Sequence, residues 1–329
     1  MKAAIYRRYG GPEVVQPEEV ATPVLRANEV LIEVHAASVN PVDVHLMMGK
    51  PVALRLGTGI AKPRTGRLGV DVAGVVASVG AKVTRFSVGD EVFGWSRGSF
   101  ADHASAPEGW LTLKPSTLSF EEAASLPVAG AMALQGLRNI AELMPGETVL
   151  VNGAGGGIGS FAVQIARALG ADVIGVCSTP KMGLVRSLGA RDVIDYTKED
   201  FTVSGDEVDV ILDLAGSHSF RAYREILRKG GRVVVGGHAA AGYSETPLDF
   251  LRGLFGVFLA TVMSRFGSKK FKPYLQRPSV PDLDLLAQFV IRGDMKPVID
   301  VRAGLASVQD AIADVANGHA AGKIVITIA

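Results

Sequence analysis

The chain has 329 residues and a mass of 34.5 kDa, which is enough for about two domains of roughly 150 residues each. Hydrophobic residues make up 48% and charged residues 20%, so the chain can bury a core and is not of the disordered class. Its 34 Lys and Arg against 33 Asp and Glu leave a net charge of +1, and aromatic residues make up only 6%. This balance excludes a polyanion binder, because a surplus of cations is missing, so we expect no nucleic-acid partner.

The cysteine content and the N-terminus bear on the compartment. Cys177 is the single cysteine of the sequence, and one thiol can form neither an intrachain disulfide nor a Cys-rich zinc site. No apolar segment follows the basic residues near Met1, so a signal peptide is not predicted. We therefore expect a cytoplasmic protein.

The first third of the chain is rich in predicted strands. Short β-branched runs are bounded by Gly, Pro and Asn breakers, among them Asn40-Pro41. The predicted strands are Met1–Tyr6, Glu29–Ala37, Gly69–Val79 and Asp90–Phe93. Such spacing is typical of a small, irregular β domain.

The pattern changes near Ser119, where helices begin to appear. Ser119 and Glu122 have the spacing of a capped helix start, and a second helix is predicted over Val128–Leu143, ended by Pro145-Gly146. Apolar strands and helices then alternate, which predicts a doubly wound parallel sheet with helices on both faces. The predicted strands are Thr148–Asn152, Asp172–Cys177, Val193–Ile194, Val208–Leu214 and Gly231–Gly237, and the predicted helices are Ile158–Leu169, Lys181–Leu188 and Ser219–Leu227.

The most hydrophobic stretch is Leu248–Met263, and its longest uncharged piece, Gly253–Ser264, has 12 residues. A membrane-spanning helix needs about 20. We therefore expect no integral membrane segment, and interpret the stretch as a buried or pocket-lining helix, with contact to a membrane surface as the alternative. A further helix over Leu283–Ile291 and a closing strand over Lys323–Ile328 complete the chain.

One segment carries a strong chemical signal. Val149–Gly159 has the order strand, glycine loop, helix that a dinucleotide site requires. Ala154 permits a tight turn, Gly156 lets backbone N–H groups approach a pyrophosphate, and Gly159 lets the helix lie close to the sheet. Gly157 is a further glycine of the loop, and the helix begins near Ile158, where its N-terminus carries free N–H groups. A turn needed only for packing is the alternative.

The residues after the second strand of this unit point to the type of nucleotide. An NAD site normally has an Asp or Glu there to bind the ribose hydroxyls. Here Ser178 and Lys181 follow the strand instead, and with Tyr196 they suit the 2′-phosphate of NADP(H). Lys181 as a solvated lysine at a helix start is the alternative. Gly236, at the end of a later strand, is a further candidate cofactor-binding residue.

These segments together resemble a known family. The motif Val39–Asp43 is similar to the Asn-Pro signature of the zinc-free, zeta-crystallin-like quinone oxidoreductases of the medium-chain dehydrogenase/reductase superfamily, and Leu68–Val76, Val88–Gly94, Ala154–Gly159 and Gly322–Val325 follow the same order. The resemblance implies an α/β architecture with a GroES-like β-rich domain, residues 1–122 and 273–329. A Rossmann NADP-binding domain, residues 123–272, is inserted between these segments. It also implies a homodimer.

The sequence departs from the zinc-dependent members of that superfamily. Those relatives use a Cys and a His-Glu pair, whereas the matching stretch Gly69–Asp71 has no His, and the position ahead of Asp43 carries no thiol. A catalytic zinc needs about three protein ligands. We therefore predict no metal site.

Without a metal, the chemistry must depend on hydrogen bonds and positioning. The candidate catalytic residues are Asn40, Asp43 and His45. Asn40 can donate its amide to the acceptor oxygen or hold the nicotinamide ribose, or it forms only an Asx turn before Pro41. Asp43 can order this loop or, with a strongly raised pKa, act as an acid. His45 can carry a proton or be an ordinary histidine, and water is the other proton source.

The sequence thus predicts an NADPH-dependent, zinc-independent oxidoreductase that reduces quinones, enones or related apolar carbonyl compounds. One alternative is an enoyl-thioester reductase with a basic channel, for which Arg265, Lys269, Lys270 and Lys272 are candidates. A non-catalytic NADPH-binding protein is a second alternative, and a membrane-associated scaffold is a third.

Overall fold

The computed structural model describes residues 1–204, 207–236, 247–318 and 320–328. The chain divides into two compact units, which we call unit 1 and unit 2. Unit 1 comprises Met1–Ala131, Arg277–Gly293 and Pro297–Ala329, and unit 2 comprises Met132–Gln276 and Asp294–Lys296. The divisions thus fall after residues 131 and 276, whereas the sequence analysis proposed 122 and 272. Just before the first of these divisions, the Val128 N–H donates to Asp71 of unit 1 at 3.0 Å.

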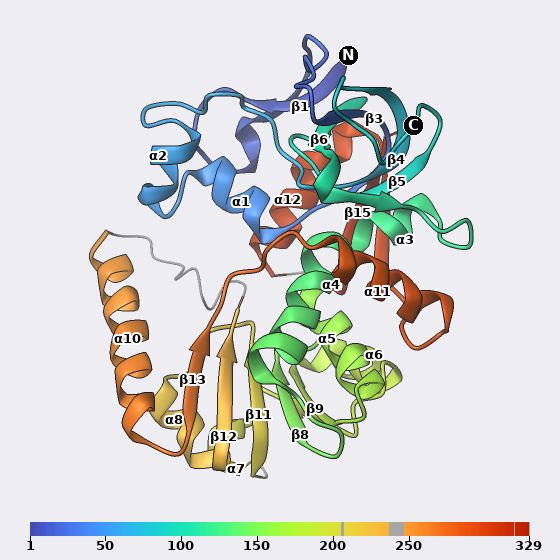
Figure 1. Cartoon of the computed structure of the whole chain (residues 1–329). Coiled ribbons are helices and arrows are strands. Elements are labelled where there is room, and N and C mark those ends of the chain that lie inside the picture. Colours follow the sequence, from blue (N-terminus) through green and yellow to red (C-terminus); the bar gives the residue numbers. More distant parts are fainter. Residues whose placement is uncertain (205–206, 237–246, 319, 329) are drawn as a thin grey trace. The chain divides into compact units, whose positions relative to one another are not determined.

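Unit 1 is built on a seven-stranded sheet with the order β14-β15-β3-β4-β5-β7, and β6 pairs with β3 (Figure 1). The pairs of β3 are antiparallel, and β14 and β15 run parallel. A separate hairpin joins β1 (Lys2–Tyr6) and β2 (Val15–Glu19). The sheet strands are β3 (Glu29–Ser38), β4 (Asp71–Val79), β5 (Glu91–Trp95), β6 (His103–Pro107), β7 (Leu111–Leu113), β14 (Ile299–Ala303) and β15 (Lys323–Thr327).

The helices of unit 1 cover this β framework and shield its apolar side chains. Val30, Ile32 and Val34 of β3 are buried in one core with Ile312 of α12. Alternate residues of a strand share a face, and this alternation gives the sheet its core side. The helices are α1 (Pro41–Met48), α2 (Arg55–Thr58), α3 (Phe120–Ser125), α11 (Val280–Ile291) and α12 (Val308–Ala316), with 3₁₀ turns at Pro12–Val14, Val52–Leu54, Glu108–Trp110 and Leu305–Ser307. Helix α4 (Pro127–Leu134) leads from unit 1 into unit 2.

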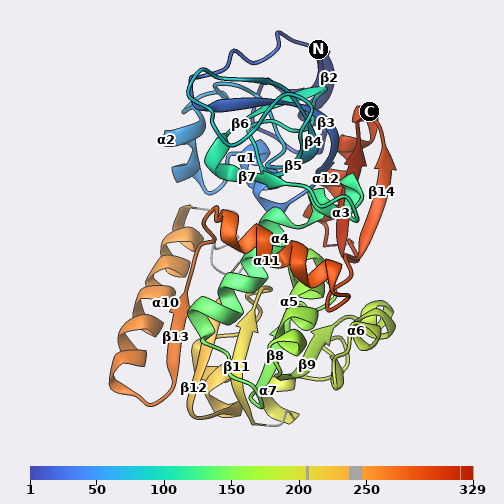
Figure 2. The same cartoon turned by 45° about the vertical axis from the view of Figure 1, so that its right-hand side comes forward.

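Unit 2 contains a six-stranded sheet in which every pair is parallel, with the order β10-β9-β8-β11-β12-β13. The strand order reverses between β8 and β11, and this switch point is where doubly wound sheets bind ligands. Figure 2 shows α10 beside β13 at one end of this sheet. The strands are β8 (Thr148–Asn152), β9 (Asp172–Cys177), β10 (Asp192–Asp195), β11 (Val208–Asp213), β12 (Leu227–Val235) and β13 (Lys270–Pro273), and the helices are α5 (Gly157–Ala168), α6 (Met182–Ser187), α7 (Phe201–Ser204), α8 (Phe220–Ile226) and α10 (Pro247–Phe266).

Two predicted elements differ from the structure. The single helix predicted over Val128–Leu143 is instead α4 followed by a π-helical segment, Gln135–Ala141. Where the helix changes, the Tyr274 hydroxyl donates to the Met132 carbonyl oxygen, and the Tyr274 ring lies where a Cβ on Gly136 would be. The predicted breaker Asn40-Pro41 begins helix α1, because proline suits the first helical position.

Other elements were not predicted at all. The missed elements are strands β2, β6, β7, β13 and β14 and helices α1, α2, α7 and α12. The strands are short, and so are α2 and α7, while α1 lacks a clear apolar period. Helix α12 does have apolar residues at helical spacing, Val308, Ala311 and Ile312, and was overlooked. Position 237, the predicted end of one strand, lies outside the described residues. The final strand β15 pairs with β3 through Val325 and Ser38, so the C-terminal strand does join the first domain.

Helix α10 is the predicted apolar helix, and it is not fully covered within the chain. Phe258, Leu259, Met263 and Phe266 have 63%, 45%, 47% and 89% of their surface exposed. Within the stretch Leu248–Met263, interpreted as a buried or pocket-lining helix, Phe258, Leu259 and Met263 are therefore not buried. Among the helices of the described ranges, none combines the length and apolar character that crossing a membrane requires.

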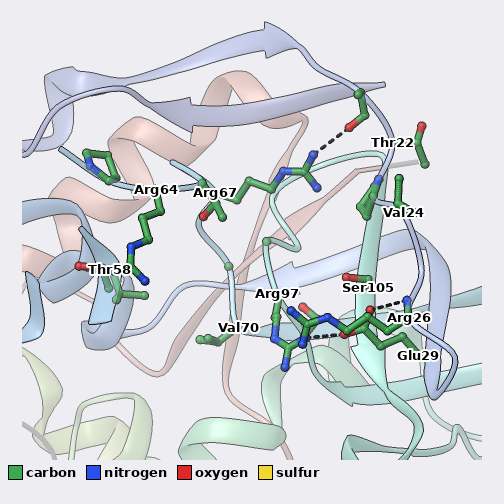
Figure 3. Close-up of a pocket in the computed structure, with 18 of the residues that line it drawn as sticks. Thr22, Val24, Arg26, Glu29, Thr58, Arg64, Arg67, Val70, Arg97 and Ser105 are labelled. Carbon is green, nitrogen blue, oxygen red and sulfur yellow. Dashed lines mark hydrogen bonds and ion pairs between the residues drawn. The ribbon is translucent and has the colours of Figure 1, made fainter. Parts of the chain in front are cut away.

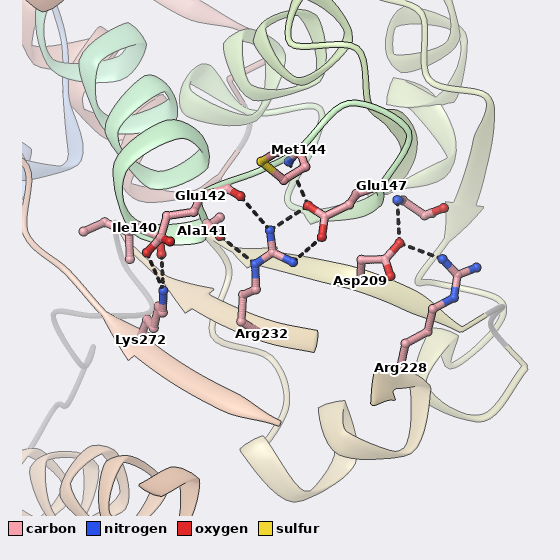
Figure 4. Close-up of polar contacts among 10 residues, drawn as sticks. Ile140, Ala141, Glu142, Met144, Glu147, Asp209, Arg228, Arg232 and Lys272 are labelled. Carbon is pink, nitrogen blue, oxygen red and sulfur yellow. Dashed lines mark hydrogen bonds and ion pairs between the residues drawn. The ribbon is translucent and has the colours of Figure 1, made fainter. Parts of the chain in front are cut away.

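One ionic cluster secures the turn between the π-helical segment and β8 (Figure 4). Both terminal nitrogens of Arg232 on β12 contact the Glu147 carboxylate at 2.6 Å. Its Nε and Nη2 also donate to the carbonyl oxygens of Ala141 and Glu142. These bonds lower the pKa of Glu147 below its ordinary value. Bidentate pairs of this kind are stronger than single surface pairs, so we infer that the cluster stabilises unit 2.

We predict that Arg232→Met lowers the free energy of unfolding by about 2–3 kcal/mol, because Glu147 and two carbonyl groups lose the guanidinium donors and Glu147 keeps the Met144 N–H. Chemical denaturation measures this loss. Arg228→Met is the matched control, since the exposed Arg228 bonds to Asp209 and should lose no more than about 1 kcal/mol. Equal losses in the two variants would contradict a special role for Arg232.

Candidate functional site: a nucleotide loop and a buried polar cluster

The glycine loop of unit 2 connects β8 to α5, and its small residues are required by close contacts. Gly153 has φ +93°, in the left-handed region that favours glycine. A Cβ on Gly159 would lie 2.1 Å from the Gly153 carbonyl oxygen. Ala154 is fully buried, and its N–H donates to Val176 on β9 at 2.9 Å. The loop therefore lies tightly against the sheet, as the sequence analysis expected for Ala154 and Gly159.

The start of α5 leaves space and donors for a phosphate. Gly156 is the N-cap residue, and a Cβ there would meet only the Gly153 oxygen, at 3.5 Å. The N–H groups of Gly157 and Ile158 belong to the first turn, where helical N–H groups have no acceptor within the helix. They also lie at the positive end of the helix dipole. These residues fit the pyrophosphate of a dinucleotide.

Lys181 lies against the glycine loop. A Cβ on Gly155 would be 2.8 Å from the Lys181 Cβ and 2.9 Å from its Cδ, so the lysine stem covers this glycine. Burial lowers the pKa of Lys181 below its ordinary value. Ser178 precedes the same short turn as its N-cap. Lys181 is thus brought beside the loop, and Ser178 lies three residues before it at the start of the turn.

Tyr196 and an acid missed by the sequence analysis lie at the end of β10. The Tyr196 N–H donates to Cys177 on β9, and its side chain is 60% exposed. Asp195 is the missed residue. Its carboxylate accepts bonds from the Thr179 and Thr197 hydroxyl groups, which lower its pKa to about 2. Its position at the end of a strand of the parallel sheet is the sequence signal that points to it.

Gly236 has a packing reason for being glycine. A Cβ there would lie 2.5 Å from Cε1 of Tyr274, and the Gly236 N–H donates to the Asp213 carbonyl. At the same edge, Asn152 donates to the Asp213 carboxylate at 2.9 Å and to Ser217 at 3.0 Å. The sequence analysis missed this buried pair, which fixes the ends of β8 and β11 together.

Unit 1 holds a fully buried polar cluster around Asp71 and Lys323. Lys323 Nζ lies 3.6 Å from the Asp71 carboxylate and donates to the Val39 carbonyl at 2.9 Å. The Asp71 carboxylate also accepts from Ser38 at 2.6 Å and from the Val128 N–H at 3.0 Å. Burial raises the pKa of Asp71 and lowers that of Lys323, while their mutual attraction opposes both shifts.

Asn40 belongs to this cluster and is 1% exposed. Its Nδ2 donates to Asp71 at 2.7 Å and to the Ser38 carbonyl at 3.2 Å, and its Oδ1 accepts from Lys323 at 2.6 Å. Both amide hydrogens are therefore used inside the protein. This differs from the expectation that Asn40 donates to a substrate oxygen, and its backbone position is the N-cap of α1.

Asp43 orders the same loop, as expected. Its carboxylate accepts from the backbone N–H groups of Asn40 and Gly69, both at 2.9 Å. Burial and the nearby Asp71 raise its pKa, the two N–H donors and Lys323 oppose the rise, and the result is about 7. Because Asp43 is completely buried, we expect a change in its protonation to alter the stability of this loop.

His45 lies two residues after Asp43 on α1 and is partly buried. Its Nδ1 is 3.1 Å from the Lys50 carbonyl oxygen, and burial lowers its pKa below the ordinary value. The ring is therefore mostly neutral at pH 7.

The residues at the metal position of zinc-dependent relatives do not fit zinc. Val70 stands between Gly69 and Asp71, and the oxygens of Asp71 are occupied by the donors described above. Within the described ranges, no three His, Cys, Asp or Glu side chains lie close enough together to hold a metal ion.

Comparisons with known proteins agree with this geometry. The alcohol dehydrogenase GroES-like domain family matches residues 26–116, and the zinc-binding dehydrogenase family matches residues 188–326. The 2-methylene-furan-3-one reductase of Solanum lycopersicum is 36% identical over 99% of this chain and 79% of that protein. The chain belongs to the zinc-free quinone oxidoreductase branch of the medium-chain dehydrogenase/reductase superfamily.

Two further relatives agree with this assignment. The chloroplastic NADPH-dependent alkenal/one oxidoreductase of Arabidopsis thaliana is 34% identical over 99% of this chain and 79% of that protein. The quinone oxidoreductase structure from Coxiella burnetii has a TM-score of 0.85 and 28% identity, and the match covers 100% of this chain and 99% of that one. The protein is thus an NAD(P)H-type oxidoreductase with a GroES-like unit and a Rossmann unit.

We predict that Asp43 makes the stability of this oxidoreductase fall as pH rises. A carboxyl group whose pKa is raised to about 7 on folding stabilises fully below its unfolded pKa, and this contribution is lost as pH rises toward 7. The unfolding free energy of the wild type, relative to Asp43→Asn, should fall by about 2 kcal/mol between pH 5 and 8.

Chemical denaturation at the two pH values tests this difference. Met47→Ala is the control, because it removes a buried apolar side chain from the same helix and should cost the same at both pH values. A wild-type advantage over Asp43→Asn that does not change with pH would refute the raised pKa.

Proposed function

We propose that the protein is an NADPH-dependent reductase of small apolar quinones, enones or related carbonyl compounds. The observation that carries the proposal is the tight loop between β8 and α5, with Lys181 lying over Gly155. Two relatives support the substrate class by their printed names, a 2-methylene-furan-3-one reductase and an alkenal/one oxidoreductase. A quinone oxidoreductase among the similar structures supports the quinone substrates.

The preference for NADPH rests on the charges beside the loop. Lys181 brings a cation and Ser178 a hydroxyl group to the turn after β9. Asp195 is a nearby acid, but Thr179 and Thr197 bind its carboxylate, and Lys198 lies 3.5 Å from it. We infer that the lysine at the loop outweighs this compensated acid and favours the 2′-phosphate, with Tyr196 beside it.

The chemistry needs no metal in this proposal. When bound, the reduced nicotinamide supplies a hydride to the acceptor. The residues of α1 have positioning roles: Asp43 fixes the loop by two N–H bonds, and Asn40 holds Lys323 and Asp71 in place. A mostly neutral His45 is a weak proton donor, so we propose that water supplies the proton to the delocalised oxyanion.

We also propose that the protein acts as a homodimer in the cytoplasm. The family resemblance supports the dimer, and the single cysteine suits a reducing compartment. Analytical ultracentrifugation tests the first statement and fractionation of cells the second.

The lysines that were predicted to form a basic channel do not support an enoyl-thioester reductase. Lys269 donates to the Arg224 carbonyl, Lys270 to the carbonyls of Ser264 and Gly267, and Lys272 to that of Ile140. These lysines hold backbone groups in place and do not form a shared channel.

We predict that Lys181→Ala weakens NADPH binding by about tenfold or more and leaves NADH binding nearly unchanged, because one charge-assisted bond to phosphate is lost. Titration of nucleotide fluorescence measures both constants. Lys229→Ala is the control, an exposed lysine on β12. An equal loss for both nucleotides would make Lys181 a structural residue.

We predict that the purified protein oxidises NADPH with small apolar quinones or enones and has little activity on primary alcohols. Alcohol oxidation at neutral pH needs a stabilised alkoxide, a task usually performed by zinc, and the residues around Asp71 do not fit zinc. Nicotinamide absorbance follows the reaction. Tight NADPH binding without turnover on a broad panel of acceptors would replace this proposal with the non-catalytic alternative.

A further inference from the structure

A cavity of about 860 Å³ lies entirely within unit 1 (Figure 3). Its walls come from the loop after β2, the segment between α2 and β4, and the turn between β5 and β6. Leu46, Pro63, Val70 and Trp110 supply apolar surface, and several Ser and Thr side chains supply hydroxyl groups. The cavity is large enough for a small organic molecule.

The charges around this cavity are unbalanced. Its charged lining residues are four arginines, Arg26, Arg64, Arg67 and Arg97, and one acid, Glu29. Arg97 contacts the Glu29 carboxylate at 2.5 Å and lies over the Trp110 ring, so its charge is compensated. For the other three, no ion pair with an acid is found among the described residues. Three guanidinium groups around one cavity create a positive potential that favours an anion.

Arg67 is held in place for such a role. Its stem passes over Gly98, where a Cβ would lie 2.8 Å from the Arg67 Cβ, and Gly98 has φ +86°. Its Nη2 donates to the Ala21 carbonyl at 2.8 Å. Partial burial lowers the pKa of Arg67, which is the cost of taking a guanidinium out of water without a carboxylate beside it. A bound oxyanion would offset this cost.

Arg64 lines the same cavity from the same segment. Its backbone N–H donates to the Thr58 carbonyl at 2.8 Å, which fixes the loop, and its side chain is exposed. Figure 3 shows Arg64 beside Thr58, Arg67 extending across the top of the view, and Arg97 with Glu29 below them. The planar forks of arginine match the oxygens of carboxylate and phosphate groups.

We propose that this cavity binds an amphipathic oxyanion, a small molecule with a carboxylate or phosphate headgroup and a short apolar tail. Arg67 and Arg64 bind the headgroup, and the tail lies against surfaces such as Leu46 and Val70. The site is separate from the glycine loop of unit 2, and binding there does not depend on the proposed reductase activity.

Calorimetric titration of the full-length protein, with its nucleotide site saturated by NADP⁺, tests the proposal. The probes are decanoate, decyl phosphate and decanol, which share one tail and differ in headgroup. Decanoate or decyl phosphate should bind with a Kd below about 1 mM, at least about tenfold more tightly than decanol. The stronger of the two anions then identifies the headgroup.

Three variants locate the site. Arg64→Gln/Arg67→Gln should lose about tenfold or more in affinity for the preferred anion. Arg8→Gln, an exposed arginine of unit 1 outside the cavity, removes one such charge and should bind within about twofold of the wild type. Arg64→Glu reverses an exposed charge without removing the packed stem of Arg67, so it tests the site even if the double variant does not fold.

Clear outcomes overturn the proposal. Equal affinity for decanol and the anions would show that the headgroup is not recognised. Anion binding by Arg64→Glu that equals the wild type, or no anion binding at about 1 mM, would rule the site out. Turnover of NADPH is not measured in any arm, so failure here leaves the reductase proposal standing.

Discussion

The buried pair of Lys323 and Asp71 is the interaction on which unit 1 depends. Lys323 opens the last strand, whereas Asp71 opens β4, so the pair joins two segments that are more than two hundred residues apart in the chain. Taking both charges out of water is costly unless hydrogen bonds satisfy them. Asn40, Ser38 and the Val128 N–H meet that demand. The cluster thereby fixes the start of α1 and the approach to α4.

The same cluster explains why Asn, Pro and Asp stand at positions 40, 41 and 43 of the Asn-Pro motif. Asn40 is both acceptor for Lys323 and donor to Asp71, a combination that an amide provides and a carboxylate or an alkyl group does not. Pro41 starts the helix at once, and Asp43 closes its first turn from inside. Burial is the main cause of the raised pKa of Asp43, and the second buried acid, Asp71, adds to it. The motif is therefore a device for positioning α1.

In unit 2 the main constraint is different: backbone segments must approach one another closely. Gly159 and Ala154 bring α5 against β8 and β9, and Lys181 then covers Gly155. This arrangement leaves the helix N-terminus as a place for phosphate. The two units therefore divide their physical tasks. The nucleotide loop of unit 2 depends on the small residues Gly159 and Ala154, whereas the start of α1 in unit 1 depends on buried charges.

The sequence alone determined the parallel sheet of unit 2 and its glycine loop, because apolar periodicity and loop spacing are local properties. It also placed the return of β15 to the first domain, through the resemblance carried by Gly322–Val325. Only the tertiary structure decided what Asn40 does, since its partners Asp71 and Lys323 are remote in sequence. The π-helical segment near Gly136 likewise depends on contacts with the distant Tyr274. The grouping of arginines around the cavity depends on which loops meet there. Contacts between residues that are distant in sequence leave no periodic pattern in the chain, so they can be identified only in the folded structure.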